Sequence, residues 1–460
     1  MLKTQDGYAT AASDAAGEAA FATDLRFRLN GEDIVLTDVD PSVLLVDWLR
    51  SPAVGLTGTK KSCAQGGCGA CTVMLSRYDA PHADVEHLSI NSCLRPLCTL
   101  DGMEITTTEG TGSCRTELSP VQYRIAKDNG SQCGYCTPGF VMNMTAFLAA
   151  NGNRPIGQKE IEDLFDGNLC RCTGYRAILY GMKHFASDWG PGYEVGCLKT
   201  VVDPSERVPH AKTIVTSFPD SMKHPPRAVH YAKDGYHYYR PTSLEQVHII
   251  LNEQAQSGSL ENVRLVGGNT SIGVYDRFVE NPHVLIDISQ LDALHGIDLG
   301  DDGLIVGSAV TYSDFLGALD RLLADPALDA GRRAGVDSMR YMAHRTAGTI
   351  VRNAATLAGN TMLVVRHVDA GEPFPSDLFT ALASLGASVD ISMPDGSSLQ
   401  LPLLEFARQY QSSKPLQAGV LARYRVPWTH ANEYARTFKT ALREENAHSI
   451  VVWPVSSRAA

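Results

Sequence analysis

The cysteines are the residues of this chain whose type and spacing could do chemistry. All eleven lie before residue 198 of the 460, at positions 63, 68, 71, 93, 98, 114, 133, 136, 170, 172 and 197. They are too sparse for a disulfide scaffold and too clustered to be scattered core thiols. The sequence therefore divides into a half that carries cysteine and a half that has none.

Four cysteines have the spacing of a plant-type [2Fe–2S] site, C-x4-C-x2-C and then a fourth after 21 intervening residues. They are Cys63, Cys68, Cys71 and Cys93. Gly66, Gly67 and Gly69 lack Cβ atoms, so this loop can fold closely round a cluster and direct backbone N–H groups at its sulfurs. The alternatives are a zinc site, which favours paired C-x2-C knuckles, and buried structural thiols, which a polar glycine-rich loop does not favour.

A second set joins C-x2-C to C-x1-C across 33 intervening residues. Its members are Cys133, Cys136, Cys170 and Cys172. Taken alone, the first pair could be a redox dithiol or half of a zinc knuckle. The C-x-C pair is an awkward chelate for tetrahedral zinc but can direct adjacent sulfurs at one iron, so we expect a second [2Fe–2S] cluster. We expect Cys98 to be a core thiol, whereas Cys114 and Cys197 have no partner at ligand spacing.

The elements before and between these cysteines fall into two kinds. Apolar residues alternate with arginines at Leu25, Phe27 and Leu29, and the apolar residues 34–36 follow Asn30-Gly31, which predicts a β-hairpin with a tight turn. Asp40-Pro41 would then supply the N-cap and first-turn proline of a short helix whose apolar face includes Val43 and Trp48. Further on, Thr137-Pro138 would open a helix that stops near Gly152, and residues 161–165 begin another.

The half without cysteine predicts an α+β domain that ends near Pro427. Residues 243–253 have a helical pattern, and residues 263–266, 284–288 and 304–306 have the pattern of short strands. The stretch before them is rich in proline and has little periodicity, as expected of a linker between domains.

Length, composition and charge exclude several classes of protein. The 460 residues suggest about three domains at ~150 residues each. The composition, 44% hydrophobic and 20% charged, is that of a soluble globular protein, and the net charge of −11 argues against nucleic acid or a membrane as a partner. No run approaches ~18 apolar residues and Met1 to Asp24 lacks the pattern of a secretory signal, so we expect a cytoplasmic protein.

Three strings in this order resemble the iron–sulfur region of the xanthine dehydrogenase branch of the molybdenum hydroxylases. They are Cys63-Ala-Gln-Gly-Gly-Cys-Gly-Ala-Cys-Thr-Val73, Ser131-Gln-Cys-Gly-Tyr-Cys-Thr-Pro-Gly139 and Gly167-Asn-Leu-Cys-Arg-Cys-Thr-Gly-Tyr-Arg176. The resemblance implies a β-grasp ferredoxin domain over residues 24–112. It also implies an all-α helical-bundle [2Fe–2S] domain over residues 113–187.

Two glycine- and asparagine-rich strings extend the resemblance. Leu265-Val-Gly-Gly-Asn-Thr-Ser-Ile272 follows a predicted strand and offers N–H and hydroxyl donors for a diphosphate, although alone it is more typical of a hairpin turn. With Arg352-Asn-Ala-Ala-Thr-Leu-Ala-Gly-Asn360 and Pro375-Ser-Asp377 it resembles the FAD-binding domain of the same family. The resemblance implies a linker over residues 188–227 and an α+β, PCMH-type FAD-binding domain over residues 228–427.

Carried over position by position, the resemblance implies a set of residues that contact a non-covalent FAD. They are Leu265, Val266, Gly267, Gly268, Asn269, Thr270, Ser271, Ile272, Thr356, Leu357, Ala358, Gly359, Asn360, Asp377, Leu421 and Lys439. Asp377 could otherwise be a helix cap, and Lys439 a solvated charge. The sequence departs from the family where Ala358 replaces glycine, where Thr346 stands in place of an aromatic residue, and over residues 361–376, which are longer. Residues 428–460 look like a shortened remnant of the C-terminal domain.

The resemblance implies the electron-transfer subunit of a multidomain α+β oxidoreductase with two [2Fe–2S] clusters and FAD. Molybdopterin would sit on a large partner subunit, in a heterodimer or a dimer of heterodimers, and this chain would carry no residue that touches the substrate. The clusters would relay electrons from molybdenum to FAD and then to NAD⁺, as in xanthine dehydrogenase. The alternatives are the equivalent subunit of an aldehyde or N-heterocycle hydroxylase with another acceptor, and a cluster-bearing redox sensor or inactive paralogue.

Overall fold

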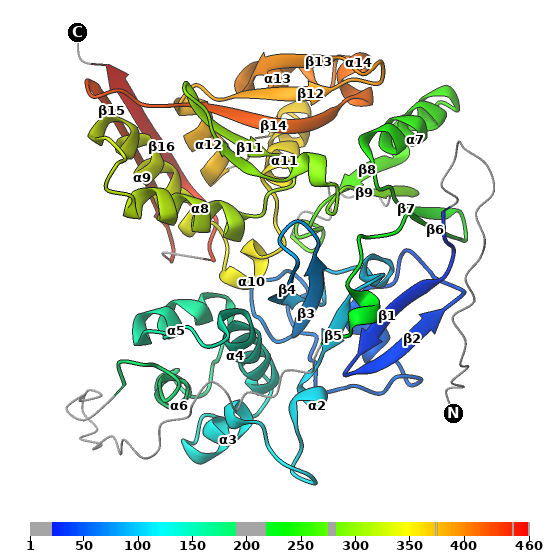
Figure 1. Cartoon of the computed structure of the whole chain (residues 1–460), viewed down its shortest axis with the longest axis vertical. Helices are drawn as coiled ribbons and strands as arrows, with labels where there is room; N and C mark the ends of the chain where they lie inside the picture. Colours follow the sequence, from blue (N-terminus) through cyan, green and yellow to red (C-terminus); the bar gives the residue numbers. More distant parts are fainter. Residues whose placement is uncertain are drawn as a thin grey trace.

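Three units of different architecture follow one another along the chain in a computed structural model of the protein (Figure 1). The structure describes residues 21–189, 218–274, 282–372, 374, 376–443 and 446–458. Cys197, Pro375 and most of the expected linker lie outside these residues. The described part has the multidomain α+β arrangement that the sequence predicts.

The first unit is a five-stranded sheet packed on a short helix. Its order is β2-β1-β5-β3-β4, with β1 parallel to β5 and the other pairs antiparallel. The elements are β1 (Leu25–Leu29), β2 (Glu32–Leu36), α1 (Leu45–Leu49), β3 (Thr72–Asp79), β4 (Asp84–Asn91), η1 (Leu97–Leu100) and β5 (Glu104–Thr106). The predicted hairpin is confirmed, because Asn30 and Gly31 join β1 to β2 with φ of 52° and 87°. Cys98 is buried in the core of this unit, as expected.

The predicted start of α1 is wrong. The helix begins at Leu45 after Leu44, and the Asp40 carboxylate instead accepts hydrogen bonds from the backbone N–H and the hydroxyl of Ser42, at 2.9 and 2.7 Å. The backbone N–H of Leu45 donates to Arg95 O at 2.8 Å, so a tertiary contact, which sequence patterns do not reveal, satisfies the first helical donor.

The second unit is all-helical, as predicted. It contains α2 (Thr108–Thr111), α3 (Pro120–Lys127), α4 (Thr137–Asn151), α5 (Gln158–Leu164), η2 (Phe165–Gly167) and α6 (Arg176–Lys183). Helix α4 has Pro138 in its first turn and ends at Gly152, whose φ is 52°, so both predicted ends are confirmed. Phe140 and Met144 of α4 pack with Ile161 and Phe185 in its core.

The third unit contains two sheets covered by helices, and a hairpin. Strands β6 (Val229–Lys233), β7 (Tyr236–Arg240), β9 (Val284–Asp287) and β8 (Val263–Val266) form one sheet in that order. Strands β10 (Ile297–Leu299), β11 (Gly303–Gly307), β14 (Val420–Pro427), β12 (Ser388–Ser392) and β13 (Ser398–Pro402) form the other. The helices are α7 (Leu244–Gln256), α8 (Tyr312–Ala324), α9 (Ala330–His344), α10 (Thr349–Arg352), α11 (Leu357–Asp369), α12 (Asp377–Ser384), α13 (Leu403–Gln409) and α14 (Lys414–Ala418). The predicted helix after Ser243 and the three predicted strands are therefore present.

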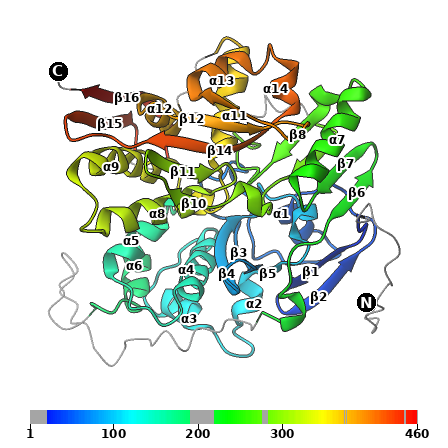
Figure 2. The same cartoon turned by 45° about the horizontal axis from the view of Figure 1, so that its top comes forward.

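The last hairpin, β15 (Glu433–Ala441) and β16 (Ser449–Arg458), lies against α9 and α12 (Figure 2). Phe438 and Trp453 face each other in its register and are 52% and 64% exposed, so its outer face is apolar. Among the described residues, no helix has the length and apolar character needed to cross a membrane.

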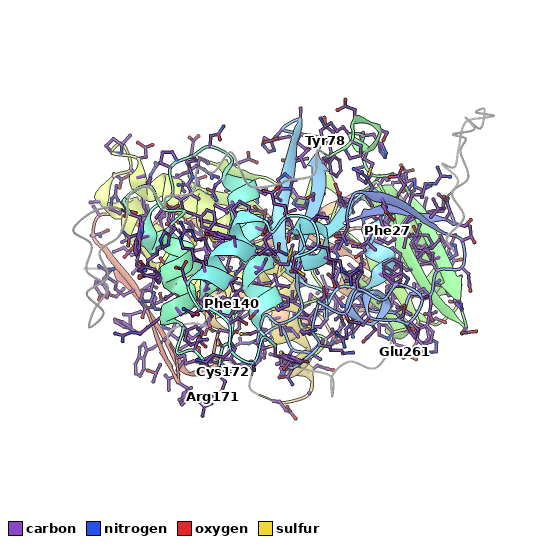
Figure 3. All side chains as sticks on the ribbon, turned by 90° about the horizontal axis from the view of Figure 1, so that it is seen from below. Phe27, Tyr78, Phe140, Arg171, Cys172 and Glu261 are labelled. Carbon is purple, nitrogen blue, oxygen red and sulfur yellow. The ribbon has the colours of Figure 1, made fainter. Side chains whose placement is uncertain are left out.

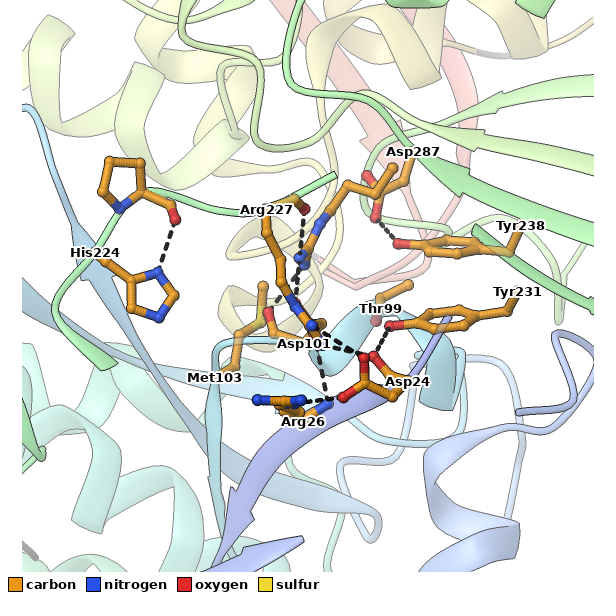
Figure 4. Close-up of polar contacts among 12 residues, drawn as sticks. Asp24, Arg26, Thr99, Asp101, Met103, His224, Arg227, Tyr231, Tyr238 and Asp287 are labelled. Atoms are coloured by element: carbon orange, nitrogen blue, oxygen red, sulfur yellow. Dashed lines mark hydrogen bonds and ion pairs between the residues drawn. The ribbon is translucent and has the colours of Figure 1, made fainter. Parts of the chain in front are cut away.

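A buried carboxylate joins the first unit to the third (Figure 4). Asp101, 3% exposed, accepts the backbone N–H of Arg26 at 3.0 Å and two guanidinium hydrogen bonds from Arg227, at 2.6 and 2.9 Å. The fully buried Arg240 donates to its carboxylate at 2.8 Å and to its carbonyl at 2.9 Å. The two arginines come from the third unit. This network therefore fixes how the five-stranded sheet of the first unit meets the four-stranded sheet of the third.

Replacing Asp101 by Asn should lower the free energy of unfolding by about 3–5 kcal/mol, because the buried guanidinium of Arg240 loses its countercharge. Urea unfolding followed by circular dichroism measures the change. Asp38→Asn is the control, because Asp38 pairs with Lys233 across the same two units but its side chain is 79% exposed, and this variant should unfold like the unaltered chain. Equal stability of the two variants would contradict the role given to Asp101.

Candidate functional site

The first set of cysteines lies in the loop before β3 and directly after β4. Hydrogen bonds between thiols join Cys63 to Cys68 and Cys71 to Cys93. Cys71 and Cys93 are buried, and the other two are half-buried. The structure therefore brings the four predicted ligands together as two pairs of thiols.

Hydrogen bonds favour thiolate in one member of each pair. The Cys68 thiol lowers the pKa of Cys63 to about 5, with help from backbone N–H groups that include that of Gln65, although burial opposes the shift. The Cys93 thiol in the same way lowers the pKa of Cys71 to about 7, and the Asn91 amide also contributes. The pKa values of the partners Cys68 and Cys93 are raised, chiefly because they donate these bonds.

Positive φ angles shape this loop. Gly66 and Gly69 have φ of 79° and 66°. Ala64 also has a positive φ, of 56°, although it is not a glycine. A Cβ on Gly69 would lie 2.5 Å from Gly167 O and from the Asn168 amide nitrogen. Glycine is required there because the second unit approaches its backbone directly.

The second set lies just before α4 and just before α6. Its thiols pair across the two motifs, Cys133 with Cys172 and Cys136 with Cys170. Burial, and then the hydrogen bond with Cys170, raises the pKa of Cys136 to about 12. Cys133 and Cys172 are exposed, and Cys172 lies with Arg171 at the margin of the molecule in Figure 3.

The thiols of each set could together hold a two-iron cluster. Among the described residues, no three His, Cys, Asp or Glu side chains are placed to hold one metal ion. Each set instead offers two pairs of thiols, and a [2Fe–2S] cluster takes two thiolates at each iron. Donors to sulfur accompany both sets, since Cys170 Sγ lies 3.4 Å from the backbone nitrogen of Thr173 and 3.1 Å from its hydroxyl.

The two cysteine sets meet through a direct backbone contact. Leu169 N–H, next to Cys170, donates to the carbonyl of Cys68 at 2.9 Å. A Cβ on Gly139 in α4 would lie only 2.2 Å from Gly69 O, so helix and loop are in close contact. A single hydrogen bond therefore connects Cys68 of the first set to Leu169, the residue before Cys170 of the second set.

The two glycine- and asparagine-rich strings also lie side by side. A Cβ on Gly268, in the turn after β8, would lie 1.7 Å from Ala354 O, and one on Gly267 would lie 3.0 Å from Thr356. Thr356 caps α11, its hydroxyl accepting Gly359 N–H at 3.1 Å. A cavity of about 30 Å³ beneath the turn has room for about one water molecule and none for a dinucleotide.

The second string is anchored in the core at one end and exposed at the other. Leu357 and Ala358 are buried, and their N–H groups donate to Val310 O and Ser308 O at 3.2 and 3.1 Å. Gly359 is exposed, and the Asn360 side chain accepts a hydrogen bond from Ser376 at 2.5 Å. Its exposed surface is therefore at Gly359, beside the turn formed by the first string. Thr270 and Ser271 in that turn are half-buried.

Asp377 and Lys439 form a buried ion pair. Lys439 Nζ lies 2.7 Å from the Asp377 carboxylate, and their side chains are 1% and 7% exposed, so the interpretation of Lys439 as a solvated charge is wrong. Asp377 is the first residue of α12, whose cap is Ser376, and it also accepts a hydrogen bond from Ser449. Leu421 lies in the same apolar cluster as Leu357 and Ala358.

The first string also reaches the first cysteine set. Ile272 packs in one apolar cluster with Cys71, Cys93 and Leu94, and a Cβ on Gly273 would lie 1.9 Å from Ala64 O. Asn269, with φ of 54°, donates to Leu94 O at 3.0 Å. The end of the first string therefore rests directly on the cysteine loop.

Several polar residues at these sites were not predicted. Asn91 lies two residues before Cys93, and Thr173 directly follows Cys172, so proximity to a ligand was an available signal for both. Asp166 and Arg352 form an ion pair between the second and third units, with side chains 4% and 5% exposed. Only the tertiary structure reveals that pair, since 185 residues separate the two.

Comparisons with known proteins agree with this arrangement. A family model described as a 2Fe-2S iron-sulfur cluster binding domain matches residues 27–98, and one described as a [2Fe-2S] binding domain matches residues 107–183. A third, the FAD binding domain in molybdopterin dehydrogenase, matches residues 233–429. The chain thus has the domains of an iron–sulfur flavoprotein.

Relatives over nearly the whole chain name the family more closely. Xanthine dehydrogenase of Drosophila pseudoobscura pseudoobscura is 32% identical over 95% of this chain, and aldehyde oxidase 1 of Rattus norvegicus is 34% identical over 93%. The chain therefore has the iron–sulfur and flavin domains of the molybdenum hydroxylase family. It spans about a third of the length of these relatives, 33% of each.

Among solved structures, quinoline 2-oxidoreductase from Pseudomonas putida 86 is similar to part of the chain. The match is 34% identical, covers 35% of this chain and 89% of that one, and has a TM-score of 0.30.

Replacing Gly69 by Ala should destabilise the protein by more than about 2 kcal/mol, because a strained φ is combined with a clash against Gly167 and Asn168. Gly55→Ala is the matched control, because Gly55 has φ of 72° but no atom within 4 Å of the added Cβ, and strain alone should cost about 1 kcal/mol. Urea unfolding compares the two variants. Equal losses would mean that the two cysteine loops are not in close contact.

Proposed function

We propose that this chain is the electron-transfer subunit of a molybdenum hydroxylase that resembles xanthine dehydrogenase. Its eight paired cysteines would hold two [2Fe–2S] clusters, and the two glycine- and asparagine-rich strings would hold FAD on their exposed side, beside Gly359. The domain boundaries proposed from the sequence, 24–112, 113–187 and 228–427, assign one cofactor to each domain.

The single observation that carries this proposal is the continuous series of contacts between the three sites. The second cysteine set has its exposed thiols, Cys133 and Cys172, at the surface. Leu169 N–H connects that set to Cys68 of the first set. Ile272 and Gly273 connect the first set to the glycine- and asparagine-rich string at residues 265–272. Electrons would therefore enter at the second cluster, pass to the first and collect on FAD.

The chain's own residues would position the flavin without a covalent link. Neither string contains a His or Cys that could attach it. Thr346 and the Asp377–Lys439 pair would lie near its ring, and Leu421 would complete the site. When bound, FAD takes electrons singly from the clusters and passes them on as a pair, for which NAD⁺ is the proposed acceptor.

The molybdenum centre is proposed to lie on a molybdopterin-binding large subunit that docks where Cys133 and Cys172 reach the surface, in a heterodimer or a dimer of heterodimers. A second candidate function is the equivalent subunit of an aldehyde or N-heterocycle hydroxylase with another acceptor. The similarity to rat aldehyde oxidase 1, 34% identical, favours keeping this alternative.

The purified chain should contain one FAD and four irons, in two spectroscopically distinct [2Fe–2S] clusters. Cys68→Ser should abolish one paramagnetic signal of the reduced protein and leave the other, and Cys172→Ser should do the reverse. Iron analysis and electron paramagnetic resonance measure both effects. Bound zinc, or two irons in the unaltered chain, would refute the assignment.

Alone, the chain should pass electrons from NADH to an artificial dye but should not oxidise hypoxanthine or xanthine. Adding the molybdenum subunit should restore purine-dependent NAD⁺ reduction, and Cys68→Ser or Cys172→Ser should block it by breaking the relay. Steady-state absorbance assays measure each reaction. Purine oxidation by the isolated chain would refute the proposed partner, and FAD that NADH cannot reduce would favour the second candidate.

A further inference from the structure

The turn between α9 and α10, residues 345–348, lies where all three units meet. In Figure 1, α10 sits between the helices of the second unit and strand β4 of the first. A Cβ on Gly348 would lie 2.8 Å from Gly167 Cα, so the turn is in backbone contact with the loop that precedes Cys170. A displacement of the second cysteine loop would therefore displace this turn as well.

Asp166 and Arg352 fix that contact from both sides. The Asp166 carboxylate lies 2.5 Å from the Arg352 guanidinium, and it accepts the Thr349 backbone N–H at 2.7 Å and the Thr349 hydroxyl at 3.0 Å. Both charged side chains are at least nine-tenths buried. A buried charge pair with every oxygen satisfied tolerates little displacement, so the second unit is held against α10 in one geometry.

The other arm of Arg352 holds the turn itself. Its Nη1 donates to the carbonyls of His344 and Ala347 at 2.8 Å each, and to that of Thr346 at 3.3 Å. Ala347 has a φ of 53°, a conformation that a residue with a Cβ adopts only when neighbours impose it. The guanidinium fork supplies that constraint, because it binds Asp166 and the turn carbonyls simultaneously.

The same turn also contacts the polar residues proposed to lie near the flavin ring. Lys439 donates a hydrogen bond to the carbonyl of Arg345, and the Thr346 hydroxyl lies 3.5 Å from the Asp377 carboxylate. Displacing the turn would therefore displace the Lys439 ammonium and alter the surroundings of Asp377.

The first cysteine loop contacts the same turn. Asn446, between β15 and β16, donates its side-chain N–H to Gly67 O at 2.9 Å and its backbone N–H to Ala347 O at 3.4 Å. A Cβ on Gly66 would lie 3.0 Å from the Val351 side chain at α10. Both cysteine loops and the Asp377–Lys439 pair thus share one short turn as their common neighbour.

We infer that Asp166, a residue of the second iron–sulfur unit, is a positioning residue of the flavin site. Asp166 acts through Arg352, whose guanidinium binds the turn at residues 345–348. That turn positions Thr346, which belongs to it, and Lys439, which donates to its Arg345 carbonyl. The assignment rests on the proposed function, because it requires that FAD binds beside these residues. It adds that the affinity for FAD and the flavin potential depend on a carboxylate outside the flavin domain.

The test compares Asp166→Asn with Asp38→Asn in the full-length chain. Asn has only one acceptor oxygen, so it cannot accept from both the Arg352 guanidinium and the Thr349 backbone N–H. Asp38, by contrast, joins the first and third units through an exposed pair with Lys233. With Asp166→Asn, iron content and both paramagnetic signals should remain, while the dissociation constant for FAD should rise at least tenfold and the flavin midpoint potential should shift. Asp38→Asn should change FAD affinity less than twofold and leave the potential unchanged.

Three outcomes overturn the inference. The first is an FAD affinity and potential for Asp166→Asn equal to those of Asp38→Asn. The second is the joint loss of FAD and iron, which would give Asp166 a merely structural role. The third concerns Arg352→Lys, which keeps the charge but cannot bind Asp166 and three carbonyls at once. It should weaken FAD binding as Asp166→Asn does, and normal binding would mean that charge alone matters.

The unaltered chain separates this inference from the proposed function. If it takes up four irons and one FAD, the proposed function stands, and the variants then decide the role of Asp166 alone. If it takes up no FAD, the proposed function and this assignment are both wrong.

Discussion

Three buried aspartates, each paired with a cation from a different unit or segment, hold this molecule together. Asp101 of the first unit binds Arg227 and Arg240 of the third, Asp166 of the second binds Arg352, and Asp377 binds Lys439 of the final hairpin. Removing two such charges from water costs several kcal/mol, and only good geometry with further hydrogen bonds offsets this cost. These pairs therefore contribute less to net stability than to specifying a single arrangement of the units.

That arrangement matters because the candidate cofactor sites belong to different units. Contact between the two cysteine loops depends on Leu169 and Gly69. Contact between the first cysteine loop and the glycine- and asparagine-rich string at residues 265–272 depends on Ile272 and Gly273. A change in how two units meet would separate these loops while leaving each unit folded. Electron transfer across such contacts thus depends on interfaces as much as on the ligands themselves.

Local chemistry explains what the sequence predicted well. The Asn30-Gly31 turn, the proline and glycine at the two ends of α4, and the spacing of the eight cysteines are all encoded within a few residues. The features that the sequence did not reveal have tertiary causes. Helix α1 starts where Arg95 O accepts its first donor, Lys439 is buried beside Asp377, and the thiols of the second set pair across motifs 33 residues apart.

The final hairpin has two faces with different tasks. Its inner face presents Lys439 to Asp377, while its outer face leaves Phe438 and Trp453 open to water. Trp453 is the most exposed of the four tryptophans, since Trp189 and Trp428 are 4% and 8% exposed and Trp48 is half-buried. The intrinsic fluorescence of the chain therefore contains one component that a soluble quencher reaches easily, and a loss of that quenching would report any molecule that binds this face.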